Sequence, residues 1–123
     1  MLDSRTRIVP PQSAAEWWRR SPRKPGVVTG YFDPLVAAHV RRLEEIAGAG
    51  GGLMVLVGSP EKPILPLAAR AELVAALRMV ECVVPCVGEE MAQVLAELGG
   101  TQVTREEAAI RSSGLEKTNL PSA

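Results

Sequence analysis

The chain has 123 residues, one histidine, and 14 basic and 14 acidic side chains. This length fits one domain, and because the charges cancel, no overall field draws the protein to nucleic acid or to an anionic membrane surface. No run of residues approaches the length of a membrane span, and the first residues lack the apolar core of a secretory signal, so we expect a cytoplasmic protein with no nucleic-acid or membrane partner.

Residues 1–25 predict an amino-terminal arm followed by a short helix. The opening dozen residues, which end in Val9-Pro10-Pro11, are typical of an extended and loosely held arm. Ser13 and Glu16 have the spacing of a capping box, which predicts that the helix starts at Ser13. Two prolines, at positions 22 and 25, end it.

Trp17 and Trp18 are adjacent in this short helix. Neighbouring positions on a helix point in different directions, and tryptophan is enriched at the centres of protein interfaces. We therefore predict a homodimer, the commonest assembly of soluble chains, with these residues at or near the contact. In the alternative interpretation, both rings pack on their own domain.

Strands alternate with helices over residues 26–100. The patterns predict strands at 26–31, 53–57 and 82–87 and helices at 35–47, 67–79 and 89–98. This alternation predicts an α/β domain with a mostly parallel sheet between two helix layers, a three-layer Rossmann-like sandwich. Ligands of such sheets bind beyond the carboxyl ends of the strands, where residues 29–33, the loop at 58–62 and the start of the helix with Arg70 should meet.

Two patterns resemble binding motifs but predict structural roles. The glycine-rich segment 48–52 follows a helix and precedes a strand, which is the reverse of the order in a phosphate-binding loop. Cys82 and Cys86 lie four residues apart on a predicted strand, about 13 Å, which is too far for a disulfide. No further cysteine or nearby histidine completes a zinc site, so we predict two reduced, partly buried thiols and no bound metal.

Residues 27–42 predict a phosphate site. They run from an apolar strand through the turn at Gly30 into a helix whose first turn carries His39. Free backbone N–H groups and the positive end of the helix dipole meet where such a helix begins, and both stabilise an anion.

Two ordered blocks resemble the cytidylyltransferase-like nucleotidyltransferases. Residues 30–33, Gly-Tyr-Phe-Asp, and His39 resemble the family signature, a strand followed by Gly-x-Phe-Asp-x-x-His-x-Gly-His. Residues 62–84, with Pro-Ile-Leu-Pro at 63–66 and then Arg70, resemble a block of the ADP-heptose synthase adenylyltransferases. The resemblance is greatest to the group of these enzymes and the glycerol-3-phosphate cytidylyltransferases, which are frequently dimeric.

The resemblance implies a nucleotide or a phosphorylated small molecule as ligand. It implies that His39 is catalytic and that seven residues bind the nucleotide: Thr29, Gly30, Tyr31, Phe32, Asp33, Lys62 and Arg70. In an active enzyme, Mg²⁺ would accompany CTP or ATP, and a nucleotidyl group would pass to a sugar or alcohol phosphate. The alternatives are surface charge for Lys62 and Arg70, a turn or cap for Asp33, and ordinary packing at a helix end for His39.

The chain departs from the signature at two positions. Val36 replaces its first histidine and Ala38 its glycine. A missing hydrogen-bond donor to the developing charge costs about 10²- to 10³-fold in turnover, so the sequence leaves the enzyme question open. Three hypotheses remain: an active or residual nucleotidyltransferase, a noncatalytic relative that binds a nucleotide or metabolite at the same place, and a structural or partner-binding subunit that keeps only the fold.

Beyond Gly100 the resemblance fades, and residues 101–123 predict a solvated tail in place of the family's longer carboxyl-terminal segment. Residues 110–114, Ile-Arg-Ser-Ser-Gly, resemble only weakly the Ser/Thr-rich segment that contacts the triphosphate in the family. The predicted domain is therefore truncated at its carboxyl end.

Overall fold

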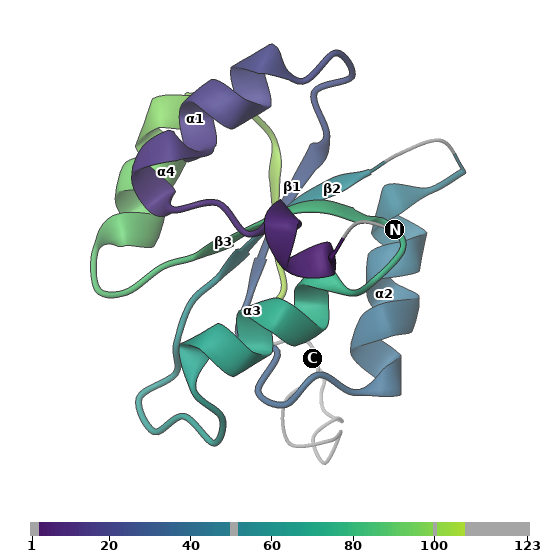
Figure 1. Ribbon diagram of the computed structural model, residues 1–123, viewed down its shortest axis with the longest axis vertical. Coiled ribbons are helices and arrows are strands. Elements are labelled where there is room, and N and C mark those ends of the chain that lie inside the picture. Colours follow the sequence, from purple (N-terminus) through teal and green to yellow (C-terminus); the bar gives the residue numbers. More distant parts are fainter. Residues whose placement is uncertain (1–2, 50–51, 100, 108–123) are drawn as a thin grey trace, which may run out of the picture.

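The computed structural model describes residues 3–49, 52–99 and 101–107. In chain order, the elements are η1 (Ser4–Arg7), α1 (Pro11–Arg20), β1 (Gly26–Gly30), α2 (Ala37–Ala47), β2 (Leu53–Val57), α3 (Leu67–Ala75), β3 (Val80–Pro85), α4 (Glu90–Leu98) and β4 (Val103–Arg105). The four described strands form one parallel sheet between two helix layers (Figure 1). The predicted α/β class and its parallel sheet are confirmed.

The strand order β3-β2-β1-β4 defines a switch point at β1. From β1 the chain moves outward through β2 to β3, and then returns across the sheet through α4 to place β4 on the other side of β1. Val27 of β1 accordingly pairs with Met54 of β2 on one side and with Val103 of β4 on the other. Ligands of open parallel sheets bind where the order reverses, which here lies between the carboxyl ends of β1 and β4.

Each face of the sheet has its own core. One cluster joins Val28 and Val55 to Leu43 of α2 and Val74 of α3. On the opposite face, a second cluster joins alternate strand residues to α1 and α4, which lie side by side (Figure 1). Because helices cover both faces, all five residues of β2 are buried, which explains its continuous apolar sequence.

The amino-terminal segment differs from the expected loose arm. The Val9 amide donates a hydrogen bond of 2.8 Å to the Val83 carbonyl. The guanidinium of Arg7 donates to the carbonyls of Ala75, Leu77 and Val80, at 3.1, 3.1 and 2.9 Å. Arg7 thus donates to carbonyls at the end of α3, in the turn that follows it and at the start of β3, and these contacts hold the arm against the domain.

Three helices begin or end at residues other than those predicted from the sequence. The capping-box prediction at Ser13 is wrong, because α1 begins two residues earlier with Pro11 in its first turn, and its N-cap makes no side-chain bond. Helix α2 begins at Ala37 rather than at residue 35, and α3 ends at Ala75 rather than at residue 79. Residues 103–105, expected to belong to a solvated tail, form β4, whereas residues 110–114 lie outside the described residues.

The two tryptophans pack on their own domain. Both are partly buried against the α1–α4 core, and the Trp18 indole nitrogen donates to the Pro25 carbonyl at 2.9 Å. Trp17 also borders a groove of about 530 Å³ between α1 and β3. Cys82 and Cys86 are buried and unpaired, as predicted, and burial raises the pKa of each thiol to about 12.

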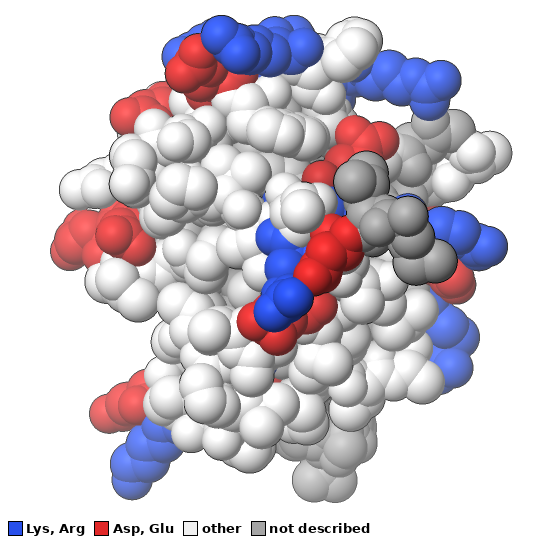
Figure 2. Space-filling view, in the orientation of Figure 1, with Lys and Arg blue, Asp and Glu red and all other residues white. Residues whose placement is uncertain are grey.

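The surface carries both signs of charge. Figure 2 shows basic side chains lying beside acidic ones over the visible face, in keeping with the net charge of zero. Within the described ranges, no helix combines the length and the apolar character that a membrane crossing needs.

Candidate functional site

The turn after β1 folds back on itself. Phe32 has a φ of 49° and is buried in the core, at 3% exposure. A Cβ atom at position 30 would lie 2.7 Å from the Phe32 ring, so Gly30 is required for the turn to close. The Phe32 ring in turn meets the edge of the His39 ring, with centroids 5.4 Å apart. Gly30 and Phe32 therefore shape the turn, and the Phe32 ring packs against His39.

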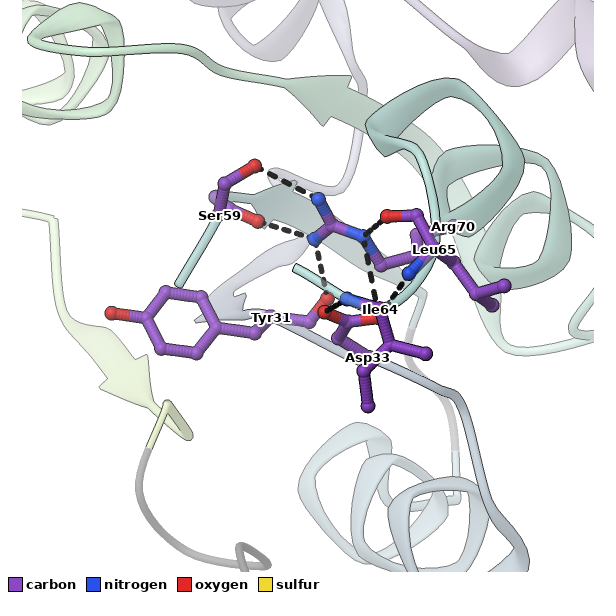
Figure 3. A network of polar contacts seen from close by, with 7 residues as sticks. Tyr31, Asp33, Ser59, Ile64, Leu65 and Arg70 are labelled. Atoms are coloured by element: carbon purple, nitrogen blue, oxygen red, sulfur yellow. Dashed lines mark hydrogen bonds and ion pairs between the residues drawn. The ribbon is translucent and has the colours of Figure 1, made fainter. Parts of the chain in front are cut away.

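Asp33 joins this turn to the loop before α3. Its carboxylate accepts hydrogen bonds from the amides of Ile64, at 2.7 Å, and Leu65, at 2.8 Å (Figure 3). A carboxylate that accepts two backbone N–H bonds fixes the loop in place. Asp33 thus connects the two sequence blocks, 30–33 and 62–84, on which the family resemblance depends.

Arg70 is completely buried, at 0% exposure. It donates to four acceptors: the carbonyls of Tyr31 (2.9 Å), Gly58 (2.6 Å) and Leu65 (3.0 Å), and the Ser59 hydroxyl (2.8 Å). Its Nε also lies 3.9 Å from the Asp33 carboxylate (Figure 3). Arg70 therefore holds together the loops that follow β1 and β2. The arrangement favours positioning over direct contact with a phosphate, which stays a prediction.

His39 stands in the first turn of α2, where its Nδ1 accepts the Val36 amide at 3.0 Å. In the neutral ring the proton is then on Nε2. Burial lowers the pKa of His39, and the negative charge of Glu106 partly opposes this shift. The ring is therefore neutral near pH 7 and offers Nε2–H as a donor.

The start of α2 also offers free backbone donors. Among the residues that the structure describes, the amides of Ala37 and Ala38 donate to no partner. Two unpaired amides, the helix dipole and the His39 Nε2–H together form the kind of environment that binds a phosphate group.

The lowered pKa of His39 predicts a pH-dependent stability. The unfolded chain takes up a proton near pH 6.5 and the folded chain only at lower pH, so the free energy of unfolding should fall as the pH drops below about 6.5. His39→Gln should abolish this component, because glutamine at this position can accept the same amide without titrating. Urea unfolding of both proteins between pH 7.5 and about 5 tests this; identical pH profiles would contradict it.

The remaining predicted residues lie at different depths. Thr29 is fully buried in β1, flanked by Leu56 and Arg105, and its hydroxyl has no hydrogen-bond partner among the described residues. Tyr31 is partly buried, whereas Lys62 is exposed on the loop after β2. The structure thus brings residues 29–33, His39 and Arg70 to one edge of the sheet and leaves Lys62 on the surface of the loop.

Two residues that the sequence analysis did not identify lie at the same edge. The Glu106 amide donates to the Thr29 carbonyl at 2.8 Å, and its carboxylate is 5% exposed. The Arg42 Nε lies 3.3 Å from both oxygens of that carboxylate. The signal that could have revealed Glu106 is its place directly after a strand; it was missed because the three residues of β4 were assigned to the tail.

The potential metal ligands among the described residues are not gathered into a cluster. The described residues contain no group of three His, Cys, Asp or Glu side chains that could hold a metal ion. The two buried carboxylates at this edge are already engaged, Asp33 by two amides and Glu106 by Arg42. Magnesium commonly binds through one or two carboxylates together with substrate phosphates and water.

Three concave regions of the described surface lie elsewhere. They border α1, the amino-terminal end of the sheet, and the groove between η1 and α3, and their linings include none of the predicted site residues. A phosphate at a helix start binds to free amides and needs no deep cavity, so the β1–α2 edge stays the candidate site.

No family model matches the chain. It is 40% identical to the bifunctional protein HldE of Hydrogenovibrio crunogenus over an alignment of 78 residues that covers 56% of this chain and 16% of that protein. It is 43% identical to the FAD synthase of Haloterrigena turkmenica over an alignment of 61 residues that covers 45% of this chain and 43% of that protein. The chain therefore spans less than half the length of either relative. Both relatives are members of the cytidylyltransferase-like nucleotidyltransferase superfamily, so this partial similarity supports a nucleotidyltransferase-like chain without selecting one group of the superfamily.

Proposed function

We propose that this chain binds a nucleotide or a phosphorylated metabolite where β1 meets α2. Transfer of a nucleotidyl group from CTP or ATP to a sugar or alcohol phosphate is weak or lost. The observation that carries the proposal is the set of donors at the start of α2: the unpaired amides of Ala37 and Ala38 and the Nε2–H of His39. They lie at the switch point of the sheet, where ligands of this architecture bind.

The weak or lost transfer follows from the position of Val36. Its side chain is 43% exposed at the N-cap of α2, where the family signature has a histidine, and valine has no group that can donate to a phosphate.

We also propose, from the dimers common in the family, that the protein is a homodimer. The groove beside Trp17 gives the tryptophan segment one surface for that contact.

Ala37→Pro tests the anion site through the backbone. Proline at the first helical position removes one free amide without breaking an intrahelical bond, and the extended backbone of Val36, with φ −125° and ψ 170°, is compatible with a following proline. A hydrogen bond to a charged group contributes about 1.5 to 3 kcal/mol. The substitution should therefore weaken phosphate affinity by roughly 10- to 100-fold while the melting temperature changes little.

The measurement is titration calorimetry with AMP, CMP, ATP and CTP. Ala37→Val serves as the matched control, because it adds side-chain volume at the same exposed position and keeps the amide. If the wild type binds no nucleotide at millimolar concentration, the proposal fails, and the chain would instead be a scaffold that keeps only the fold. If Ala37→Pro and Ala37→Val bind equally well, the phosphate does not contact the start of α2.

A further inference from the structure

Glu106 bridges the two elements that flank the switch point. Its amide is bonded to Thr29 at the end of β1, so the residue follows the sheet edge closely. Its carboxylate reaches α2, where Arg42 binds both oxygens at 3.3 Å. Arg42 is three residues after His39 and therefore neighbours it on the same side of the helix. A buried negative charge thus sits beside the proposed phosphate site.

The two partners of this ion pair differ in exposure. The Glu106 side chain is 5% exposed, whereas that of Arg42 is 44% exposed. Arg42 also contacts Glu45 at 3.3 Å, through a carboxylate that is 69% exposed. Arg42 is therefore free to turn toward a ligand, but doing so leaves the buried Glu106 carboxylate without its cation.

The charged groups around the Glu106 carboxylate determine how a phosphate would bind beside it. The groups nearby on α2 are His39, neutral near pH 7, and the Arg42–Glu45 pair; on β4 and just beyond it they are Arg105 and Glu107. A phosphate next to a buried carboxylate is repelled, whereas the fork of an arginine matches phosphate oxygens. Ligand phosphate and Glu106 therefore compete for Arg42.

We propose that Glu106 is the specificity-determining residue of the β1–α2 edge. Its carboxylate is the resident anion beside the first turns of α2, and a ligand phosphate binds when Arg42 exchanges Glu106 for that phosphate. The inference rests on the proposed phosphate site and adds a selectivity to it. The site disfavours a triphosphate, which brings the most negative charge, and accepts a monophosphate more readily.

Glu106→Gln should reverse this preference. The amide keeps the shape and an acceptor for Arg42 but removes the charge, so ATP affinity should rise by about tenfold and AMP affinity by less. Titration calorimetry in EDTA, at one ionic strength, measures both. Glu45→Gln is the matched control, because it removes an exposed carboxylate from the same arginine and should change ATP affinity by less than about twofold. In the Arg42→Gln background the gain from Glu106→Gln should be smaller, because only the direct repulsion between the carboxylate and the phosphate is then relieved.

Each outcome bears on a different part of the proposal. If the wild type binds ATP and Glu106→Gln binds it no better, the role of Glu106 is overturned while the phosphate site stands. If neither protein binds ATP or AMP at millimolar concentration, both are overturned. Should Glu106→Gln melt at room temperature, Arg42→Gln alone decides: we expect it to weaken ATP binding by about tenfold, and unchanged affinity would overturn the exchange.

Discussion

Replacing Arg70 with methionine should destabilise the protein by about 3 to 5 kcal/mol, the usual cost of removing one partner of a buried ion pair. The change leaves the Asp33 carboxylate without its cation and the carbonyls of Tyr31, Gly58 and Leu65 without the arginine donor. Domains of this size have about 5 to 15 kcal/mol in total, so a large part of the stability would be lost. Urea unfolding measures the difference directly.

Arg78→Met is the matched control for this experiment. Arg78 is exposed, and the same substitution there should change the free energy of unfolding by about 0.5 kcal/mol or less. Arg70→Lys should fall between the two, because lysine keeps the charge but cannot reach four acceptors with one planar group. If Arg70→Met were as stable as Arg78→Met, the loops after β1 and β2 would be held by other contacts.

The sheet could be predicted because its signals are local. The residues of β2 form a continuous apolar run, and the strands and helices alternate at regular lengths, so the parallel architecture follows without tertiary information. The turn at Gly30 and the placement of His39 in the first turn of a helix were also visible, since they depend on a few neighbouring residues. These features predicted that residues 29–33 and the start of the helix with Arg70 meet at one edge of the sheet, as the structure shows.

The roles of Arg70 and Glu106 could not be predicted in the same way. The sequence places Arg70 in the first turn of a helix, but its complete burial depends on loops 12 and 39 residues away that supply its acceptors. Glu106 follows a strand of three residues with little apolar pattern, and its importance appears only once β4 is known to lie beside β1. Both cases depend on contacts between distant segments, which periodicity does not encode.

The same distinction explains the helix ends. The sequence pattern predicts a helix that continues to residue 79, whereas α3 ends at Ala75. The carbonyls of Ala75 and Leu77 accept hydrogen bonds from Arg7, which comes from the far end of the sequence. A helix end that is satisfied by a distant arginine leaves no signal in the residues around it.

The largest gain of activity is expected from restoring the family signature with Val36→His and Ala38→Gly. Position 36 is 43% exposed at the start of α2, so a histidine there has room to reach a phosphate bound at the proposed site. Restoring one donor to the developing charge should raise the rate of pyrophosphate release from ATP or CTP, with a sugar phosphate acceptor, by up to about 10²- to 10³-fold. Val36→Ala with Ala38→Gly is the control, because it opens the same space without a donor.

A gain confined to the histidine variant identifies the missing donor as the main defect. If activity appears only when Glu106→Gln is added, the buried carboxylate is the second obstacle, and a wild-type turnover of several per second would show that the histidine pair is dispensable in this chain.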